Sequence, residues 1–349
     1  MRRLTPGLRA WLIARSSKEQ RQRQRRRGKG GRYGEGVSDR NAKFPWLPPR
    51  PHFVDPREVR LVGDIDLIHK PDETLAQLTS LDRIESMGLP QRVMLDLKQV
   101  RSIDSAALLF LCSRIAKLGN RPHVEVSGNY PPNDSAGLRT LRDAEFDSFL
   151  NGAPPIHFRG GAKTLSLIDG TGAGSRLVTG GIATRINEFL KGRHPGLSTE
   201  ELDALSLAVT ECLENVRVHA YGDAKPERRK GWYVVGRYDE SSLTSSVAIL
   251  DMGVGIAKTV EVRFAFGGRF KTTLDMVEAA TAGRVTASGA KNRGKGYGFL
   301  RRFVQREQGR RLTVMSSSAM VTWGKGGILE KRSTAAFTGT IVCLQITNT

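Results

Sequence analysis

Polar and apolar residues follow two different periods in the first half of the chain, and the two periods alternate along it. Alternation with a period of two, or a short apolar run, predicts strands at residues 58–67, 92–97 and 123–128. Apolar residues spaced by three and four predict helices at residues 72–88 and 136–150 and, after a cap at Asp104 or Ser105, a helix that ends at Gly119. Strands separated by helices are typical of units in which helices pack against a sheet. We therefore expect a small α/β domain over residues 51–153.

One long helix is expected in the second half of the chain. Ser198 and Glu201 form a capping-box pattern, which predicts a helix over residues 198–221. An apolar stripe runs along this helix, and three polar residues advance at four-residue intervals beside it: Glu211, Asn215 and His219. Polar residues on a solvated helix face are ordinary, so this line alone does not distinguish a functional site from a surface.

Two glycine-rich turns follow the long helix. A predicted strand runs into a D-x-G-x-G turn, in which small residues let a ligand approach the backbone beside a carboxylate: Asp251, Gly253 and Gly255. Later, alternate glycines precede an amphipathic helix, where backbone N–H groups and the positive helix end suit phosphate oxygens: Gly294, Gly296 and Gly298. A Rossmann fingerprint belongs in the first strand–helix turn rather than this late in the chain, and no Walker motif occurs.

Length and composition set the class of protein. A chain of 349 residues fits two ordinary domains, and 39% apolar with 26% charged residues is usual for a soluble globular protein. No run of about 18 apolar residues indicates a membrane span, and the apolar stretch at residues 8–14 is too short for a secretory signal. The three cysteines, each within an apolar run, predict neither a disulfide framework nor a CxxC metal site. We expect a cytoplasmic protein that does not associate with membranes.

Much of the net charge of +20 belongs to an N-terminal tail. Residues 1–32 hold twelve Lys or Arg and one acidic residue, Glu19, within an Arg-, Gln- and Gly-rich sequence. This composition predicts a disordered tail with a Pro-rich hinge over residues 1–50. Clustered arginines suit the phosphates of nucleic acid, whereas a merely solvated tail is the simpler interpretation. Nucleic-acid binding is expected, if at all, through this tail alone.

The first domain carries a strand and a turn that suggest a family. The stretch VMLDLKQVRSIDSAALLFL, residues 93–111, resembles the STAS domain of bacterial anti-sigma-factor antagonists, in which a strand leads into an Asp-Ser turn at a helix start. In phosphorylated STAS domains the acceptor hydroxyl follows this pair, and here Ala106 occupies that position. Asp104 or Ser105 can cap the helix, and we expect Ser105 to act in capping. A docking module is therefore the expected role of this domain.

The second domain, expected over residues 160–347, contains four motifs in order. E-x-x-x-N, D-x-G-x-G and G-x-G-x-G are followed, in the stretch AAFTGTIVCLQI, by a strand ending in Gly-Thr, Gly339 and Thr340. In this order they resemble the Bergerat-fold, or GHKL, ATPase domain of gyrase and histidine kinases. The stretch ECLENVRVHAYGD is most similar to the anti-sigma-factor serine kinase branch. The resemblance implies an α/β sandwich in which helices cover one face of a mixed sheet.

The resemblance implies a site for ATP and Mg²⁺. Asn215 would coordinate Mg²⁺ through its amide oxygen, because this ion prefers oxygen ligands. Glu211 would orient or deprotonate the attacking water or hydroxyl group. His219 is expected in a capping or packing role rather than in contact with nucleotide.

The same resemblance implies which residues hold the nucleotide. Asp251 would accept a hydrogen bond from the adenine amino group, and Thr340 would reach the same edge of the base. Gly253 and Gly255 would let the base lie close to the backbone. The phosphates would be wrapped by the second glycine-rich turn: Gly294, Lys295, Gly296 and Gly298.

The segment between the two turns, residues 256–295, is long and is expected to form an ATP lid that includes a helix over residues 272–283. The leading hypothesis is a regulatory ATPase or serine/threonine protein kinase of the anti-sigma type, which acts in bacterial signalling. Its partner would be a sigma factor or a STAS-type regulator, and a homodimer is left open. The alternatives are a nucleotide-sensing binding module without turnover and a histidine-kinase-like sensor component.

Overall fold

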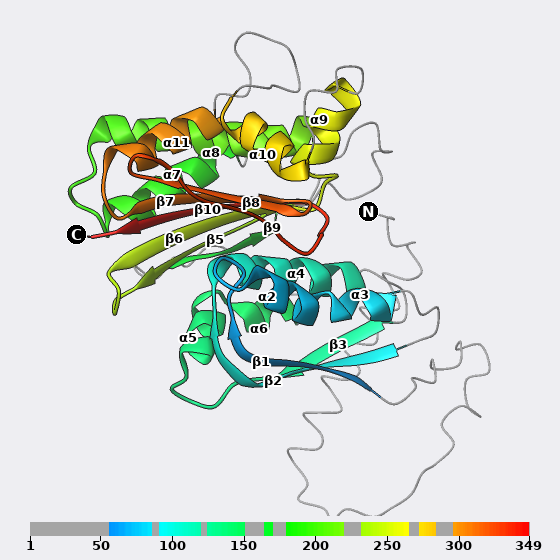
Figure 1. The fold of residues 1–349 in the computed structure, drawn as a ribbon. Coiled ribbons are helices and arrows are strands. Elements are labelled where there is room, and N and C mark those ends of the chain that lie inside the picture. The colour runs from blue at the N-terminus through cyan, green and yellow to red at the C-terminus, as the bar shows by residue number, and fades with distance from the viewer. Residues whose placement is uncertain are drawn as a thin grey trace, which may run out of the picture. The chain divides into compact units, whose positions relative to one another are not determined.

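The computed structural model describes residues 56–85, 91–119, 124–150, 164–169, 179–219, 232–264, 272–283 and 296–348 (Figure 1). The tail predicted at residues 1–50 lies outside these ranges, as do Gly294 and Lys295. Within them, no helix combines the length and the apolar character that crossing a membrane requires. The three cysteines are buried and free, which confirms that they form no disulfide.

The first part of the fold is a three-stranded parallel sheet in the order β1-β2-β3. Its strands are β1 (Arg57–Ile65), β2 (Gln91–Ile103) and β3 (Val124–Asn129). The helices that accompany it are α2 (Pro71–Leu78), α3 (Ser80–Glu85), α4 (Ser105–Gly119), α5 (Ala136–Asp143) and α6 (Phe146–Leu150). Parallel strands need long crossover connections, and helices occupy these connections here. The predicted α/β character of this part is confirmed.

Two segments predicted as single helices are each divided into two. At the end of α2, the Thr79 hydroxyl donates to the Leu75 carbonyl at 2.7 Å and the Ser80 hydroxyl donates to the Gln77 carbonyl. Between α5 and α6, Glu145 adopts a left-handed conformation with φ of 55°. The apolar spacing continues across both breaks, so the pattern of the sequence does not reveal them.

Helix α4 begins directly after Asp104. One carboxylate oxygen of Asp104 accepts the Ala107 N–H at 2.6 Å, as a helix cap does, and the other accepts the Leu67 N–H at 2.6 Å. The prediction that Ser105 caps this helix is therefore wrong. The Ser105 hydroxyl instead lies 2.8 Å from the hydroxyl of Ser246 in the second sheet.

The second sheet has seven strands in the order β4-β5-β6-β10-β7-β8-β9. They are β4 (Thr164–Asp169), β5 (Trp232–Asp239), β6 (Thr244–Asp251), β7 (Arg310–Ser316), β8 (Ala319–Gly324), β9 (Gly327–Ser333) and β10 (Thr340–Thr347). Every pair of neighbouring strands is antiparallel, so the prediction of a mixed sheet is wrong. Short connections join β5 to β6, β7 to β8 and β8 to β9, and such connections allow only antiparallel neighbours.

Helices cover one face of the seven-stranded sheet, as Figure 1 shows for α7 (Thr179–Lys191), α8 (Thr199–His219), α10 (Thr273–Thr281) and α11 (Gly296–Arg306). Helix α9 (Ile256–Phe264) follows β6 directly. The predicted capping box of α8 is confirmed, because the Ser198 N–H donates to the Glu201 carboxylate at 3.0 Å and the Glu201 N–H donates to the Ser198 hydroxyl at 3.2 Å.

The opposite face of this sheet packs against α4 of the first part, through β5, β6 and β10. Alternate residues of β6 therefore point into two different cores: Val247 and Ile249 pack with the helices α8 and α11, and Ala248 and Leu250 pack in the core that contains α4. Burial on both faces explains why the middle of β6 is a continuous apolar run rather than an alternating pattern. Residues 52–349 form one compact unit.

Candidate functional site

Asp251 and Thr340 lie opposite each other where β6 ends and β10 begins. The Asp251 carboxylate accepts the Gly253 N–H at 2.8 Å, and the hydroxyl and N–H of Thr340 lie close enough to stabilise its negative charge. Burial raises the pKa of Asp251 to about 6, although Gly253 and Thr340 favour the charged form. The sheet therefore ends in a buried carboxylate with protein donors beside it.

Two glycines shape the backbone around this carboxylate. Gly255 has φ of +84°, and a Cβ there would lie 2.7 Å from the Ser317 hydroxyl oxygen. Gly339 has φ of +116°, and its Cβ would collide with the carbonyl oxygen of Asp251. Both positions require glycine, because L-residues with side chains rarely adopt such φ values and because the neighbouring atoms leave no room. The turn glycine predicted at position 255 thus has a structural reason.

Ser316, the last residue of β7, joins the two loops and was not identified from the sequence. The Ser316 hydroxyl accepts a hydrogen bond from the Ile256 N–H at 2.8 Å and donates one to the Gly339 carbonyl at 3.1 Å. It also lies 3.2 Å from the Thr340 hydroxyl. It is fully buried. Ser316 stands in no motif, and only the pairing of β7 with β10 brings it to this position.

Glu211 lies beside the first residue of α11. A Cβ on Gly296 would be 2.8 Å from the Glu211 Cβ and 3.1 Å from the Ala208 carbonyl oxygen, so the start of α11 packs directly on α8. A side chain at position 296 would force the two helices apart. Gly298 is less restricted, because the nearest atom to its Cβ would be Arg302 Nη1, at 3.6 Å.

The helix pair and the end of the sheet converge. Burial, together with the negative charges of Glu211 and Asp251, raises the pKa of the Cys212 thiol to about 12. Burial also raises the pKa of Tyr297 well above its usual value, with contributions from Cys212 and Asp251. Residues of α8, α11 and β6 are therefore close enough for their charges to interact.

The remaining predicted site residues are only partly described. Asn215 lies half-buried on α8, one turn after Glu211, as the four-residue spacing predicts. His219 is the last residue of α8, but its side chain lies outside what the structure describes. Gly253 is buried next to Asp251.

The described residues of the candidate site fit the adenine base, the Mg²⁺ ion and the phosphates that the motifs suggested. A buried carboxylate with an adjacent hydroxyl, Asp251 with Thr340, can accept from an amino group on a flat ring. The carboxylate and amide oxygens of Glu211 and Asn215 are the hard donors that Mg²⁺ prefers. The start of α11 offers backbone N–H groups and the positive end of an eleven-residue helix.

No protein-family model matches this chain, and no curated protein matches it in sequence. The resemblances to the Bergerat-fold and STAS families therefore stay predictions from motifs.

Proposed function

We propose that the second half of the chain binds ATP with Mg²⁺ between the end of β6 and the helix pair α8 and α11. The observation that carries this proposal is the convergence of Asp251 and Thr340 with Glu211 and the start of α11. These residues come from four motifs that are separated by about 40 residues or more in the sequence. Their proximity is what a single nucleotide site requires.

Asp251 is proposed to recognise the adenine base. A buried carboxylate that already accepts the Gly253 N–H can accept one more hydrogen bond from an exocyclic amino group. Thr340 lies opposite Asp251 at the same edge of the sheet, and its hydroxyl would reach the same edge of the base. An unpaired polar group in this buried site would be costly, which favours adenine over bases without that amino group.

Asn215 and Glu211 are proposed to act on the phosphate end of the nucleotide. Mg²⁺ held by the Asn215 amide oxygen would supply positive charge to the phosphate oxygens. Glu211 would orient the attacking water or hydroxyl and accept its proton. The N–H groups at the start of α11 would bind phosphate oxygens, because Gly296 allows this helix end to lie against Glu211.

The first part of the chain is proposed to act as a fixed regulatory cap on the ATPase-like sheet. Ser105 is buried and its hydroxyl is bonded to Ser246, and Ala106 is fully buried without a hydroxyl. Neither residue can meet a phosphoryl group unless α4 leaves the sheet. We therefore propose that the phosphoryl acceptor, if the protein is a kinase, is a separate protein such as a sigma-factor regulator.

A binding and turnover assay tests this proposal. We would measure affinity for ATP and release of phosphate from ATP with Mg²⁺, with and without added bacterial lysate, for wild type, Glu211→Gln and Asn215→Ala. We expect Glu211→Gln to keep its affinity and to lose most turnover, about 100-fold or more. Asn215→Ala should bind ATP more weakly in Mg²⁺ but not in its absence.

Glu188→Gln on the exposed side of α7 is a matched control for removal of one negative charge and should change neither quantity. If wild type binds ATP tightly but releases no phosphate in any preparation, the protein is a nucleotide-sensing binding module rather than an enzyme. Absence of ATP binding by wild type would refute the proposal.

A further inference from the structure

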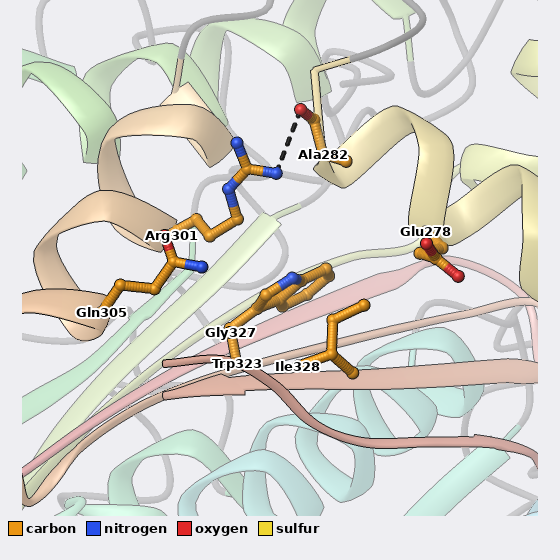
Figure 2. Close-up of a pocket in the computed structure, with 7 residues that line it drawn as sticks. All are labelled: Glu278, Ala282, Arg301, Gln305, Trp323, Gly327 and Ile328. Atoms are coloured by element: carbon orange, nitrogen blue, oxygen red, sulfur yellow. Dashed lines mark hydrogen bonds between the residues drawn. The ribbon is translucent and has the colours of Figure 1, made fainter. Parts of the chain in front are cut away.

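A second hollow lies between α10, α11, β8 and the start of β9, and it shares no residue with the candidate site. Its volume is about 410 Å³, which is within the range of small-molecule pockets. Figure 2 shows the residues that line it: Glu278, Ala282, Arg301, Gln305, Trp323, Gly327 and Ile328. The hollow is therefore built from four different elements rather than from one loop.

One wall of the hollow is rich in hydrogen-bond donors. Arg301 Nη1 donates to the Ala282 carbonyl at 3.1 Å, while Arg301 Nε is buried and has no partner among the described residues. In Figure 2 the guanidinium of Arg301, the amide of Gln305 and the indole nitrogen of Trp323 surround the same space. Arg301 as a whole is partly exposed, and a buried donor atom without a partner is costly, so this wall favours an acceptor.

The other side chains that line the hollow are apolar, or carry a charge that is already paired. The indole of Trp323, which is only 2% exposed, forms a flat floor, and Ile328, which is 44% exposed, lies beside it. Glu278, on the far side, is paired with Lys331 at 3.2 Å. The Glu278 charge is therefore balanced, and Arg301 is the lining residue whose charge can attract a ligand.

We propose that this hollow binds a small organic carboxylate with a flat apolar body, such as an aromatic acid. The planar guanidinium matches a carboxylate with two parallel hydrogen bonds, and the Gln305 amide can add a third. The flat body would lie mainly against Ile328, which is 44% exposed, above the small part of Trp323 that reaches the hollow, and it would remove the apolar surface of Ile328 from water. The hollow has room for a single ring with its carboxylate.

A carboxylate bound in this hollow would also change the affinity of the candidate nucleotide site for ATP. This second part of the inference rests on the proposed function. Helix α11 contributes Arg301 and Gln305 to the hollow and Gly296 to the contact with Glu211. Helix α10 lies in the predicted lid segment and supplies Glu278 and Ala282. A bound carboxylate would hold these two helices together and so change the affinity for ATP.

Binding can be tested by fluorine NMR with 4-(trifluoromethyl)benzoate and, as a neutral probe of the same shape, 4-(trifluoromethyl)benzamide. We expect the benzoate to bind wild type at least about ten-fold more tightly than the amide, because one charge-assisted pair is involved. Arg301→Met should weaken benzoate binding by about ten-fold or more. Arg302→Met is the matched control, because Arg302 is exposed on the same helix and stacks on Phe299, and it should leave binding unchanged.

Equal binding of the two probes, no binding of the benzoate at millimolar concentration, or an equal loss in Arg302→Met would overturn the proposal. If Arg301→Met does not fold, Gln305→Leu provides the second variant, and benzoate affinity unchanged in it would count against the site. ATP affinity measured on the same samples separates the two proposals. Benzoate binding without ATP binding would leave this site standing and would remove only its link to the nucleotide.

Discussion

Asp251 and Thr340 pair directly across β6 and β10, where both strands reach the same edge of the sheet, and the hydroxyl and N–H of Thr340 favour the charged form of the Asp251 carboxylate. This contact joins two residues that are 89 positions apart in the chain. Burial raises the pKa of Asp251 to about 6, so the carboxylate gains its proton not far below neutral pH.

Protonation of Asp251 should weaken ATP binding below pH 6. The carboxylate is fully charged above about pH 7 and can accept from the adenine amino group, whereas its protonated form loses part of this ability. We expect ATP affinity to fall as the pH decreases from 7 to 5. Asp251→Asn should bind ATP about ten-fold more weakly at pH 7.5 and show little of this pH dependence. Calorimetric titrations at several pH values would measure both effects, and an identical pH profile in the variant would contradict the assignment.

Asp104 should make the protein less stable as the pH rises from about 4 to 7. Its pKa is raised to about 7, first by burial and then by the nearby charge of Asp66. Because the folded state binds this proton more tightly than the unfolded state does, the stabilising contribution is complete below about pH 4 and is lost as the pH approaches 7. The pKa of Asp66 is lowered, so its own contribution changes only at lower pH.

Urea unfolding at pH 5 and pH 8 would measure this effect. Asp104→Asn should reduce the difference in unfolding free energy between the two pH values. The variant should also lose about 1 kcal/mol of stability, because one helix-capping interaction is weakened. Asp203→Asn, on the exposed side of α8, is the control and should retain the wild-type difference. A variant at position 104 with the full wild-type difference would show that another group titrates.

Gly339→Ala should be strongly destabilising. The new Cβ would collide with the Asp251 carbonyl oxygen, and φ of +116° is strained for alanine. We expect a loss of about 3 kcal/mol in the free energy of unfolding. Gly326→Ala is the matched control, because φ is also positive there but no atom lies within 4 Å of the new Cβ, and it should cost about 1 kcal/mol. Equal losses in the two variants would mean that the loop at 339 can move.

Phe110→Ala should destabilise both halves of the unit together. The Phe110 ring is fully buried on α4 and meets Phe337 edge to face, with ring centroids 5.7 Å apart. We expect a loss of about 3 to 5 kcal/mol in one unfolding transition, because the cavity would open in a core that both parts share. Leu207→Ala, 59% exposed on α8, should change the unfolding free energy by less than about 0.5 kcal/mol. Two separate transitions in the wild type would contradict a shared core.

Local patterns predicted the elements that depend on neighbouring residues. The capping box at Ser198 and Glu201, the strand that ends at Asp251 and the helix within residues 272–283 all depend on contacts a few positions apart, and the structure contains them. The breaks at Thr79 and Glu145 were missed, because a helix can end while the spacing of its apolar residues continues.

The pattern of the sequence predicted the helices and strands of the first part, the long helix and the strand that ends at Asp251, and it marked Glu211, Asn215, Asp251 and the glycine turns as chemically special. Only the tertiary structure decided that the second sheet is antiparallel, that Ser316 joins its loops and that α4 covers its other face. The physical reason is distance along the chain. Capping and periodicity act over three or four residues, whereas strand pairing and the packing of Phe110 on Phe337 join residues that are far apart in sequence and find each other only when the whole core forms.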